Sequence, residues 1–393
     1  MSMQGGFGGF GGFGGFGGFG GFGGFGGFGG FGGAGGFGGF GAGGGYPPYA
    51  LIQNRDGIVG TWKPQPKMLP QLVQGAVGNL ELWEPWVRAA VVDFDLMSNL
   101  HFSAPPVGDP TLWHIVVPPA APATTVCQPI ATLIRAPDPP NAFWLDQLEI
   151  VANWADLRQD RADEIVTQLS PPIVYWSTIL NLHTDRTKWT LELLGAALRL
   201  ANYAEMRFKH ELACRRPIEL SPQIRPMILT PGHGSLPSGH ATEAFIVAYV
   251  LWKLVMTQQN QDGTTKSKDW LDQLMRQAAR VAINRTVAGV HFPVDSAAGQ
   301  LLGLTLGAYF VCRAGASGQT PSDQYEARKF DGAQFVGTDD FDWRLQYSVT
   351  SDAQAPEPPR LPPPWAMTIN AQMNVAQAPL LAKLWTLAKG EWP

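Results

Sequence analysis

The chain has 393 residues, of which 45% are hydrophobic and 15% charged, and its formal net charge is −4. This balance, without blocks of Lys and Arg, argues against nucleic-acid binding, because affinity for a phosphate backbone needs clustered cations. Three dispersed cysteines, Cys127, Cys214 and Cys312, indicate neither a disulfide framework nor a zinc site. The length suggests two or three domains, although the first part of the chain has a non-globular composition.

Residues 1–45 are predicted to form a low-complexity tail of Gly-Gly-Phe repeats, with phenylalanine at every third position from Phe7 to Phe31. Ordering so many glycines is entropically costly and the phenylalanines have no apolar partners in register, so we expect a disordered tail. Its phenylalanines could mediate self-association or docking on a partner, and a linker without a partner is the alternative. Because the tail lacks the features of a secretory signal, a cytoplasmic location is favoured.

Residues 46–140 are predicted to be a Pro-rich segment with few helices and no chemistry of its own. A helix is expected to begin near Pro85, because proline suits the first turn of a helix. The apolar residues 111–117 predict a short strand that ends at Pro118.

Residues 141–315 are predicted to form the catalytic domain, because apolar residues recur there with helical spacing. This pattern predicts an all-α bundle with helices over residues 146–169, 172–209, 238–259, 270–284 and 293–313. The run from Ser296 to Cys312 is apolar enough to suggest a membrane span, but charged residues interrupt the other candidate spans. We therefore expect a soluble enzyme without membrane spans, in which this run is a buried core helix.

Residues 316–393 are predicted to be a Pro-rich C-terminal arm. Prolines between residues 355 and 364 favour an extended, polyproline-like conformation. Residues 379–389 have the pattern of a short amphipathic helix. Such an arm could pack on the core or on a second subunit.

Three short stretches in the predicted catalytic domain carry the residues that suggest chemistry. In the first, Lys209 and Arg216 are seven positions apart, which on one helix would place both cations on the same face. Pro217 predicts that this helix ends near Arg216. In the second, Ser238 and Gly239 precede a long apolar helix, and the free amide groups of such a helix start attract anions.

The third stretch contains Arg285, His291 and Asp295, with Pro293 suited to the first turn of another helix. Asp295 is positioned to accept the second ring proton of His291 and so to fix its tautomer. Three cations, a hydroxyl group, backbone donors and two imidazoles would then surround one point. Because arginine matches tetrahedral oxyanions well, the predicted ligand is a phosphate-like oxyanion.

The order and spacing of these stretches resemble the signature of vanadium-dependent haloperoxidases and the type 2 phosphatidic acid phosphatase superfamily, which includes bacterial acid phosphatases. The resemblance implies a helical bundle of that type and homodimers or larger assemblies. It also implies that the equatorial oxygens of vanadate or phosphate are held by Lys209, Arg216, Ser238, Gly239 and Arg285. His291 resembles the axial vanadium ligand of the haloperoxidases and the nucleophile of the phosphatases, and His240 resembles the general acid/base. Asn284 departs from the pattern, since the family usually has serine there.

Two details favour the haloperoxidase branch of this resemblance. His240 is followed by Ala-Thr, and His233 coincides with a second active-site histidine of bromoperoxidases. This implies hydrogen peroxide and bromide or iodide as substrates, with Lys209 polarising the peroxide. The alternative is a soluble acid phosphatase that hydrolyses phosphomonoesters through a phosphohistidine at His291. A third possibility, of another class, is a scaffold that self-associates through the Gly-Phe tail.

Overall fold

The computed structural model describes residues 48–59, 72–116, 126–169, 173–255, 267–315, 324–346, 362–373 and 375–392. The Gly-Phe tail predicted for residues 1–45 lies outside these residues. So does most of the extended segment predicted for residues 355–364.

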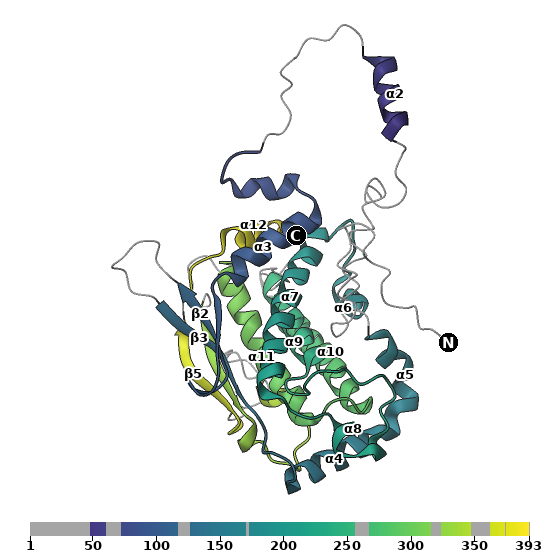
Figure 1. Ribbon diagram of the computed structural model, residues 1–393, viewed down its shortest axis with the longest axis vertical. Helices are drawn as coiled ribbons and strands as arrows, with labels where there is room; N and C mark the ends of the chain where they lie inside the picture. Colours follow the sequence, from purple (N-terminus) through teal and green to yellow (C-terminus); the bar gives the residue numbers. More distant parts are fainter. Residues whose placement is uncertain are drawn as a thin grey trace.

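A body of four long helices forms the centre of the molecule (Figure 1). Helix α9 (Gly239–Val255) packs against α7 (Lys188–Leu212), α10 (Ser267–Val287) and α11 (Pro293–Arg313). Nearly every residue of α9 and α11 is buried, which explains why both helices are apolar on all sides. Shorter helices cover the ends and flanks of this body: α3 (Pro85–Met97), α4 (Ala142–Trp154), α5 (Arg158–Thr167), α6 (Ile173–Leu180), α8 (Pro217–Leu220) and α12 (Pro379–Lys389). Helix α2 (Pro48–Ile58) lies apart from the body, with residues 50–58 exposed (Figure 1).

Several predicted helix boundaries are confirmed, whereas two predicted helices are interrupted. Helices α3, α11 and α12 begin at the prolines expected to start them. The helix predicted over residues 146–169 is divided into α4 and α5 by a short 3-10 turn, Ala155–Leu157. The helix predicted over residues 172–209 is divided into α6 and α7, because Asn181 adopts a left-handed conformation with φ of 50°. Asparagine tolerates this conformation better than most residues.

The expectation of an all-α fold is wrong, because a five-stranded sheet lies beside the helical body. The strands lie in the order in which they occur in the chain, and all neighbours are antiparallel except β3 and β4, which are parallel. Their bounds are Leu100–Ser103 (β1), Thr111–Val116 (β2), Val126–Ile134 (β3), Tyr325–Asp331 (β4) and Ala366–Met373 (β5). Only the strand at β2 was predicted. The sheet therefore joins segments that precede the long helices in the sequence to segments that follow them.

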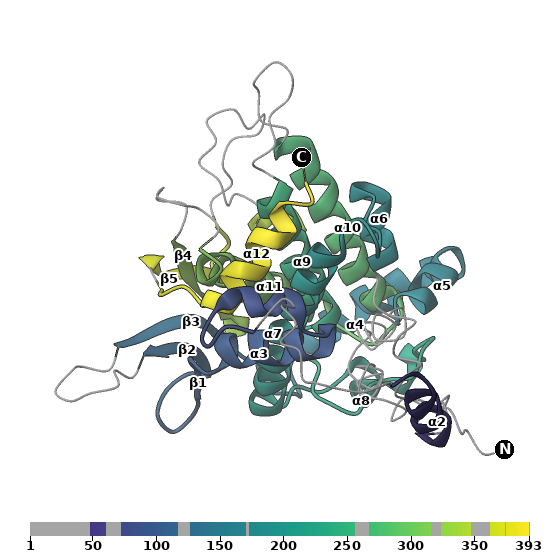
Figure 2. The same ribbon diagram turned by 90° about the horizontal axis from the view of Figure 1, so that it is seen from above.

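Helix α11 lies between the sheet and the other long helices and packs on β3 and β4 (Figure 2). On its sheet side, the Tyr309 ring packs edge-on against Tyr325 of β4, with 5.5 Å between centroids. The Tyr309 hydroxyl also lies 2.9 Å from Nδ1 of His114 on β2. The prediction that residues 296–312 form a buried core helix is confirmed. No described helix combines the length and the apolar composition that crossing a bilayer requires.

Helices α9 and α11 approach each other closely where α11 carries glycines four residues apart. A Cβ atom at Gly299 would lie 2.6 Å from the carbonyl oxygen of Ser238, and one at Gly303 would collide with the carbonyl oxygen of Thr242. Larger residues would therefore push the helices apart. The close approach fixes the start of α9 against the start of α11, where the motifs with Ser238 and His291 lie.

Glu391 caps the first turn of α7, the helix that carries Lys209. Its carboxylate oxygens accept hydrogen bonds of 2.8 Å from the backbone amides of Trp189 and Thr190. We expect Glu391→Ala to lower the free energy of unfolding by about 1–2 kcal/mol, because these helix amides lose a charged acceptor. Urea denaturation measures this change, with Glu149→Ala on the exposed part of α4 as the control. Equal stability of the two variants would contradict the assigned cap.

Candidate active site

Lys209 and Arg216 meet at one loop, although the shared helix face predicted for them is wrong. Helix α7 ends at Leu212, where the next residue, Ala213, adopts a left-handed conformation, and Arg216 precedes α8. The buried Lys209 Nζ donates to the carbonyl oxygens of Ser235 at 3.1 Å and Gly234 at 3.3 Å, and also to that of Pro237. Arg216 donates to the same loop through Gly234. Loop contacts, rather than one helix, bring the two cations together.

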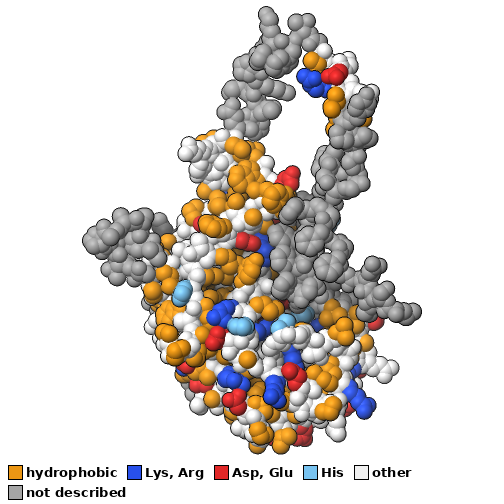
Figure 3. All heavy atoms as spheres, in the orientation of Figure 1, with side chains coloured by type: hydrophobic (Ala, Val, Ile, Leu, Met, Phe, Trp, Pro, Cys, Tyr) orange, Lys and Arg blue, Asp and Glu red, His pale blue; other side chains and the backbone are white. Residues whose placement is uncertain are grey.

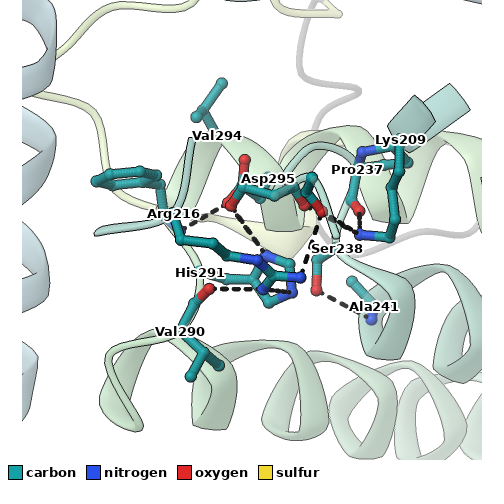
Figure 4. Close-up of polar contacts among 12 residues, drawn as sticks. Lys209, Arg216, Pro237, Ser238, Ala241, Val290, His291, Val294 and Asp295 are labelled. Carbon is teal, nitrogen blue, oxygen red and sulfur yellow. Dashed lines mark hydrogen bonds and ion pairs between the residues drawn. The ribbon is translucent and has the colours of Figure 1, made fainter. Parts of the chain in front are cut away.

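The Arg216 guanidinium lies between two histidines, His233 and His291, and Figure 4 shows its contact with His291. It is only 1% exposed, and its Nη1 donates to the Val290 carbonyl oxygen at 2.8 Å and to His291 Nε2 at 3.0 Å. Its Nη2 lies 3.1 Å from His233 Nδ1. Burial first, and then the charges of Lys209 and Arg216, lower the pKa of His233 to about 4. Both imidazoles therefore border the same fixed positive charge.

The hydrogen bonds of His291 determine its tautomer. Because Arg216 can only donate, His291 Nε2 must carry the lone pair. The other ring nitrogen, Nδ1, then carries the proton and donates to Asp295 Oδ2 at 3.1 Å, as predicted. Burial lowers the pKa of His291 well below its ordinary value, and the nearby Arg216 and Lys209 lower it further. At neutral pH, His291 therefore presents a neutral imidazole with its lone pair directed at Arg216.

Asp295 is the acceptor that holds this imidazole in place. Its Oδ2 accepts from the backbone amide of Phe292 at 2.9 Å and from the hydroxyl group of Ser235, in addition to His291. Burial raises the pKa of the Asp295 carboxyl, while the bonds from Ser235 and Phe292 oppose that rise. Sequence reasoning missed Ser235. Its serine hydroxyl within a Gly-rich loop gave no distinguishing signal.

Helix α9 begins at Gly239, which confirms that the Ser-Gly pair stands at a helix start. The Ser238 amide donates to the Asp295 carbonyl oxygen at 2.9 Å, which ties this start to α11. The first-turn amides of a helix have no helical acceptor, so they can donate to an anion. Gly239 is also required by packing, since a Cβ atom there would lie 2.5 Å from Glu205 Oε1 on α7.

Arg285 and His240 complete the set, and Gln168 connects them. Arg285 Nη2 donates to Gln168 Oε1 at 2.9 Å, while its buried Nε and Nη1 have no hydrogen-bond partner. Burial lowers the pKa of Arg285 to about 10, so it remains charged at neutral pH. His240 Nε2 lies 3.1 Å from the Gln168 carbonyl oxygen and must donate to it, since a carbonyl only accepts. Burial first, and then the charge of Arg285, lower the pKa of His240 well below its ordinary value.

Two buried carboxyl groups lie beneath these cations, and sequence reasoning missed both. The carboxyl oxygens of Glu205 on α7 have no hydrogen-bond partner among the described residues, and Glu243 on α9 has the side chain of Asn202 beside it. Burial raises the pKa of Glu205 to about 8 against the opposing charges of Lys209 and Arg216. Burial, and then Glu205, raise the pKa of Glu243 well above its ordinary value. Glu205 therefore holds its proton at neutral pH, and the same burial favours the neutral form of Glu243.

The predicted residues thus come together within the helical body, where most of their side chains are buried. The face of the molecule shown in Figure 3 carries Lys, Arg and His side chains at its surface. Burial combined with the fields of Lys209 and Arg216 lowers the pKa of both His240 and His291, which places these groups in one electrostatic environment. Cations, helix-start amides and neutral imidazoles together suit the binding of an oxyanion and the transfer of protons near it.

Comparison with known families adds one finding. A family model described as the PAP2 superfamily matches residues 190–317. This segment is therefore similar to that superfamily over about a third of the chain. The PAP2 segment extends from α7 to just beyond α11 and contains every site residue predicted from the sequence, whereas Gln168 lies outside it. A comparison with curated proteins finds no match.

Proposed function

We propose that the chain is a vanadate-dependent haloperoxidase, which oxidises bromide or iodide with hydrogen peroxide to hypohalous acid. The observation that carries this proposal is the Arg216 guanidinium held between His233 Nδ1 at 3.1 Å and His291 Nε2 at 3.0 Å. His233 is a second imidazole beside Arg216, the charge proposed to bind the oxyanion. This arrangement matches the bromoperoxidase pattern that the sequence position of His233 indicates. Similarity to the PAP2 superfamily is compatible with either a haloperoxidase or a phosphatase.

The residues present fit vanadate. Two buried nitrogen atoms of Arg285 have no acceptor, and a tetrahedral oxyanion would supply one. Its oxygens would be held by Lys209, Arg216, Ser238, Gly239 and Arg285. His291 Nε2 would be the vanadium ligand, because Asp295 holds the proton on the opposite ring nitrogen. Bound vanadate supplies a Lewis acid that activates hydrogen peroxide toward halide.

The surrounding side chains have separate tasks in this proposal. His240 donates its Nε2 proton to Gln168, so its Nδ1 is the nitrogen that accepts a proton from hydrogen peroxide. Lys209 places its ammonium group at the loop before α9 and withdraws charge from the peroxide oxygens. In the overall reaction, halide, hydrogen peroxide and one proton give hypohalous acid and water.

Phosphomonoester hydrolysis is the second candidate, favoured by the state of His291 itself. A neutral imidazole with its lone pair on Nε2 and an Asp-held proton on Nδ1 is also the form required of a nucleophile, once Arg216 turns from Nε2 to the phosphate. In that reaction His291 Nε2 attacks phosphorus, and the alcohol leaves with the Nδ1 proton of a protonated His240, whose Nε2 keeps its bond to Gln168. Water then releases phosphate from the imidazole.

The two functions are distinguished by assaying one preparation of the full chain in parallel. Protein treated with a chelator is supplied with orthovanadate, hydrogen peroxide and bromide, and bromination of a phenol dye is followed. The same protein without vanadate is tested with a generic aryl phosphate. We expect bromination that depends on vanadate and is competed by phosphate. Aryl phosphate hydrolysis that vanadate inhibits, without bromination, would replace the first proposal with the second.

A further inference from the structure

Gln168 contacts two residues of the candidate site from outside the PAP2 segment. Its side-chain oxygen accepts from Arg285 Nη2 at 2.9 Å, and its backbone oxygen accepts from His240 Nε2 at 3.1 Å. The residue is fully buried at the end of α5. One residue thereby determines the orientation of an anion-binding guanidinium and the ring nitrogen on which His240 carries its proton.

The orientation of the Gln168 amide is fixed by its neighbours. Its Oε1 faces two donors, Arg285 Nη2 and, at 3.1 Å, Asn284 Nδ2. Its Nε2 lies 3.2 Å from Glu164 Oε1, which can only accept while that carboxyl is ionised. The amide therefore presents its oxygen to the cationic side of the site and its nitrogen to the acidic side chain on α5.

Helix α5 is attached to α10 along its length, so Gln168 is held on a rigid element. Arg158 Nε donates to the Val287 carbonyl oxygen at 2.8 Å, and Arg161 Nη1 donates to Asn284 Oδ1 at 3.0 Å. Arg280 of α10 forms an ion pair with Glu164 at 2.8 Å. Asn284, the position that departs from the family pattern, is thus bound to both Arg161 and Gln168. The Asn284 amide reaches both Arg161 and Gln168, whereas the shorter side chain of a serine would not reach both.

We propose that Gln168 is a positioning residue of this site, which aims Arg285 at the bound oxyanion and holds His240 in its Nε2-protonated form. This inference rests on the oxyanion site of the proposed function. It adds that α5, outside the PAP2 segment, forms a wall of the site. A neutral side chain is required at this position, because a carboxylate would pair with Arg285 and compete with the oxyanion for it.

Gln168→Glu tests this requirement by adding a charge without a change of shape. We expect the dissociation constants of inorganic phosphate and orthovanadate, measured by titration calorimetry, to rise roughly tenfold or more at pH 8. The loss should diminish toward acidic pH as the new carboxylate is protonated beside Glu164, Arg280, Arg285 and His240. Gln159→Glu on the exposed side of α5 adds the same charge and should leave both constants unchanged.

Gln168→Leu provides the second variant, in case the glutamate prevents folding. Leucine removes the acceptor that orients Arg285 toward the oxyanion. We therefore expect a smaller loss of affinity for phosphate and vanadate, and this affinity should not recover at acidic pH. Wild-type affinity in a folded Gln168→Glu protein at pH 8 would overturn the positioning role. If only Gln168→Leu folds, unchanged affinity in that protein would do the same. A wild-type protein that binds neither anion would overturn the oxyanion site as well, so the two failures are distinguishable.

Discussion

Replacing His291 with alanine is expected to reduce vanadate-dependent bromide oxidation by at least about a thousandfold, because His291 Nε2 is the only vanadium ligand in the proposed site. The variant should remain folded. Asp295 keeps its donors Ser235 and Phe292, and Arg216 keeps the Val290 carbonyl oxygen at 2.8 Å. The measurement is initial bromination rate as a function of vanadate concentration, together with a thermal unfolding curve for each protein.

The matched control for this experiment is His210→Ala. His210 follows Lys209 on α7 but is exposed. Its replacement should leave the bromination rate unchanged. Retention of vanadate-dependent activity in His291→Ala, with a normal unfolding curve, would show that another residue holds vanadium. The same pair of variants also tests the phosphatase alternative, since His291 would be its nucleophile.

Glu205→Gln is expected to have a higher free energy of unfolding than the wild type, and this difference should grow as the pH rises from 5 to 7.5. The pKa of Glu205 is about 8 in the folded protein, against an ordinary value of 4.5, so only the folded state retains this proton in that range. The free energy of unfolding of the wild type therefore falls by about 1.4 kcal/mol per pH unit through this group. Glutamine cannot ionise, and so it removes this dependence.

The sign of this effect is not obscured by the neighbouring lysine. Burial, and then Arg216, lower the pKa of Lys209 to about 8, so its own linkage to stability lies at higher pH, between about 8 and 10.5. Urea denaturation at several pH values, with Glu149→Gln on an exposed surface as control, gives the difference directly. Parallel pH dependences for wild type and Glu205→Gln would show that Glu205 is already ionised in the folded state.

Sequence reasoning predicted those parts of the fold that local patterns determine. Proline at a first turn located α3 and α11, an amphipathic pattern located α12, and continuous apolar character marked α11 as a buried helix. The sheet was missed because its central pair joins β3 to β4, which are distant in the chain. Such a pairing leaves no periodic signal. Strand β4 also carries charged residues that alternate only weakly with apolar ones.

The candidate site shows the same limit. The spacing from His291 to Asp295 is one helical turn, and the predicted hydrogen bond between them is present. Glu205 did have a signal, because it precedes Lys209 by one turn and so shares its helix face. Glu243 was likewise a single carboxyl within an apolar helix. Gln168 gave no signal, since its position depends on how α5 packs on α10 rather than on its neighbours in sequence.

The parallel pairing of β3 with β4 has a consequence for synthesis of the chain. The first three strands leave the ribosome well before β4 and β5, because the whole helical body separates them in sequence. During that interval β3 presents a row of unpaired amide and carbonyl groups, an edge that invites association with other strands. A chaperone that shields this edge should therefore increase the yield of native protein more than strengthening the helices would.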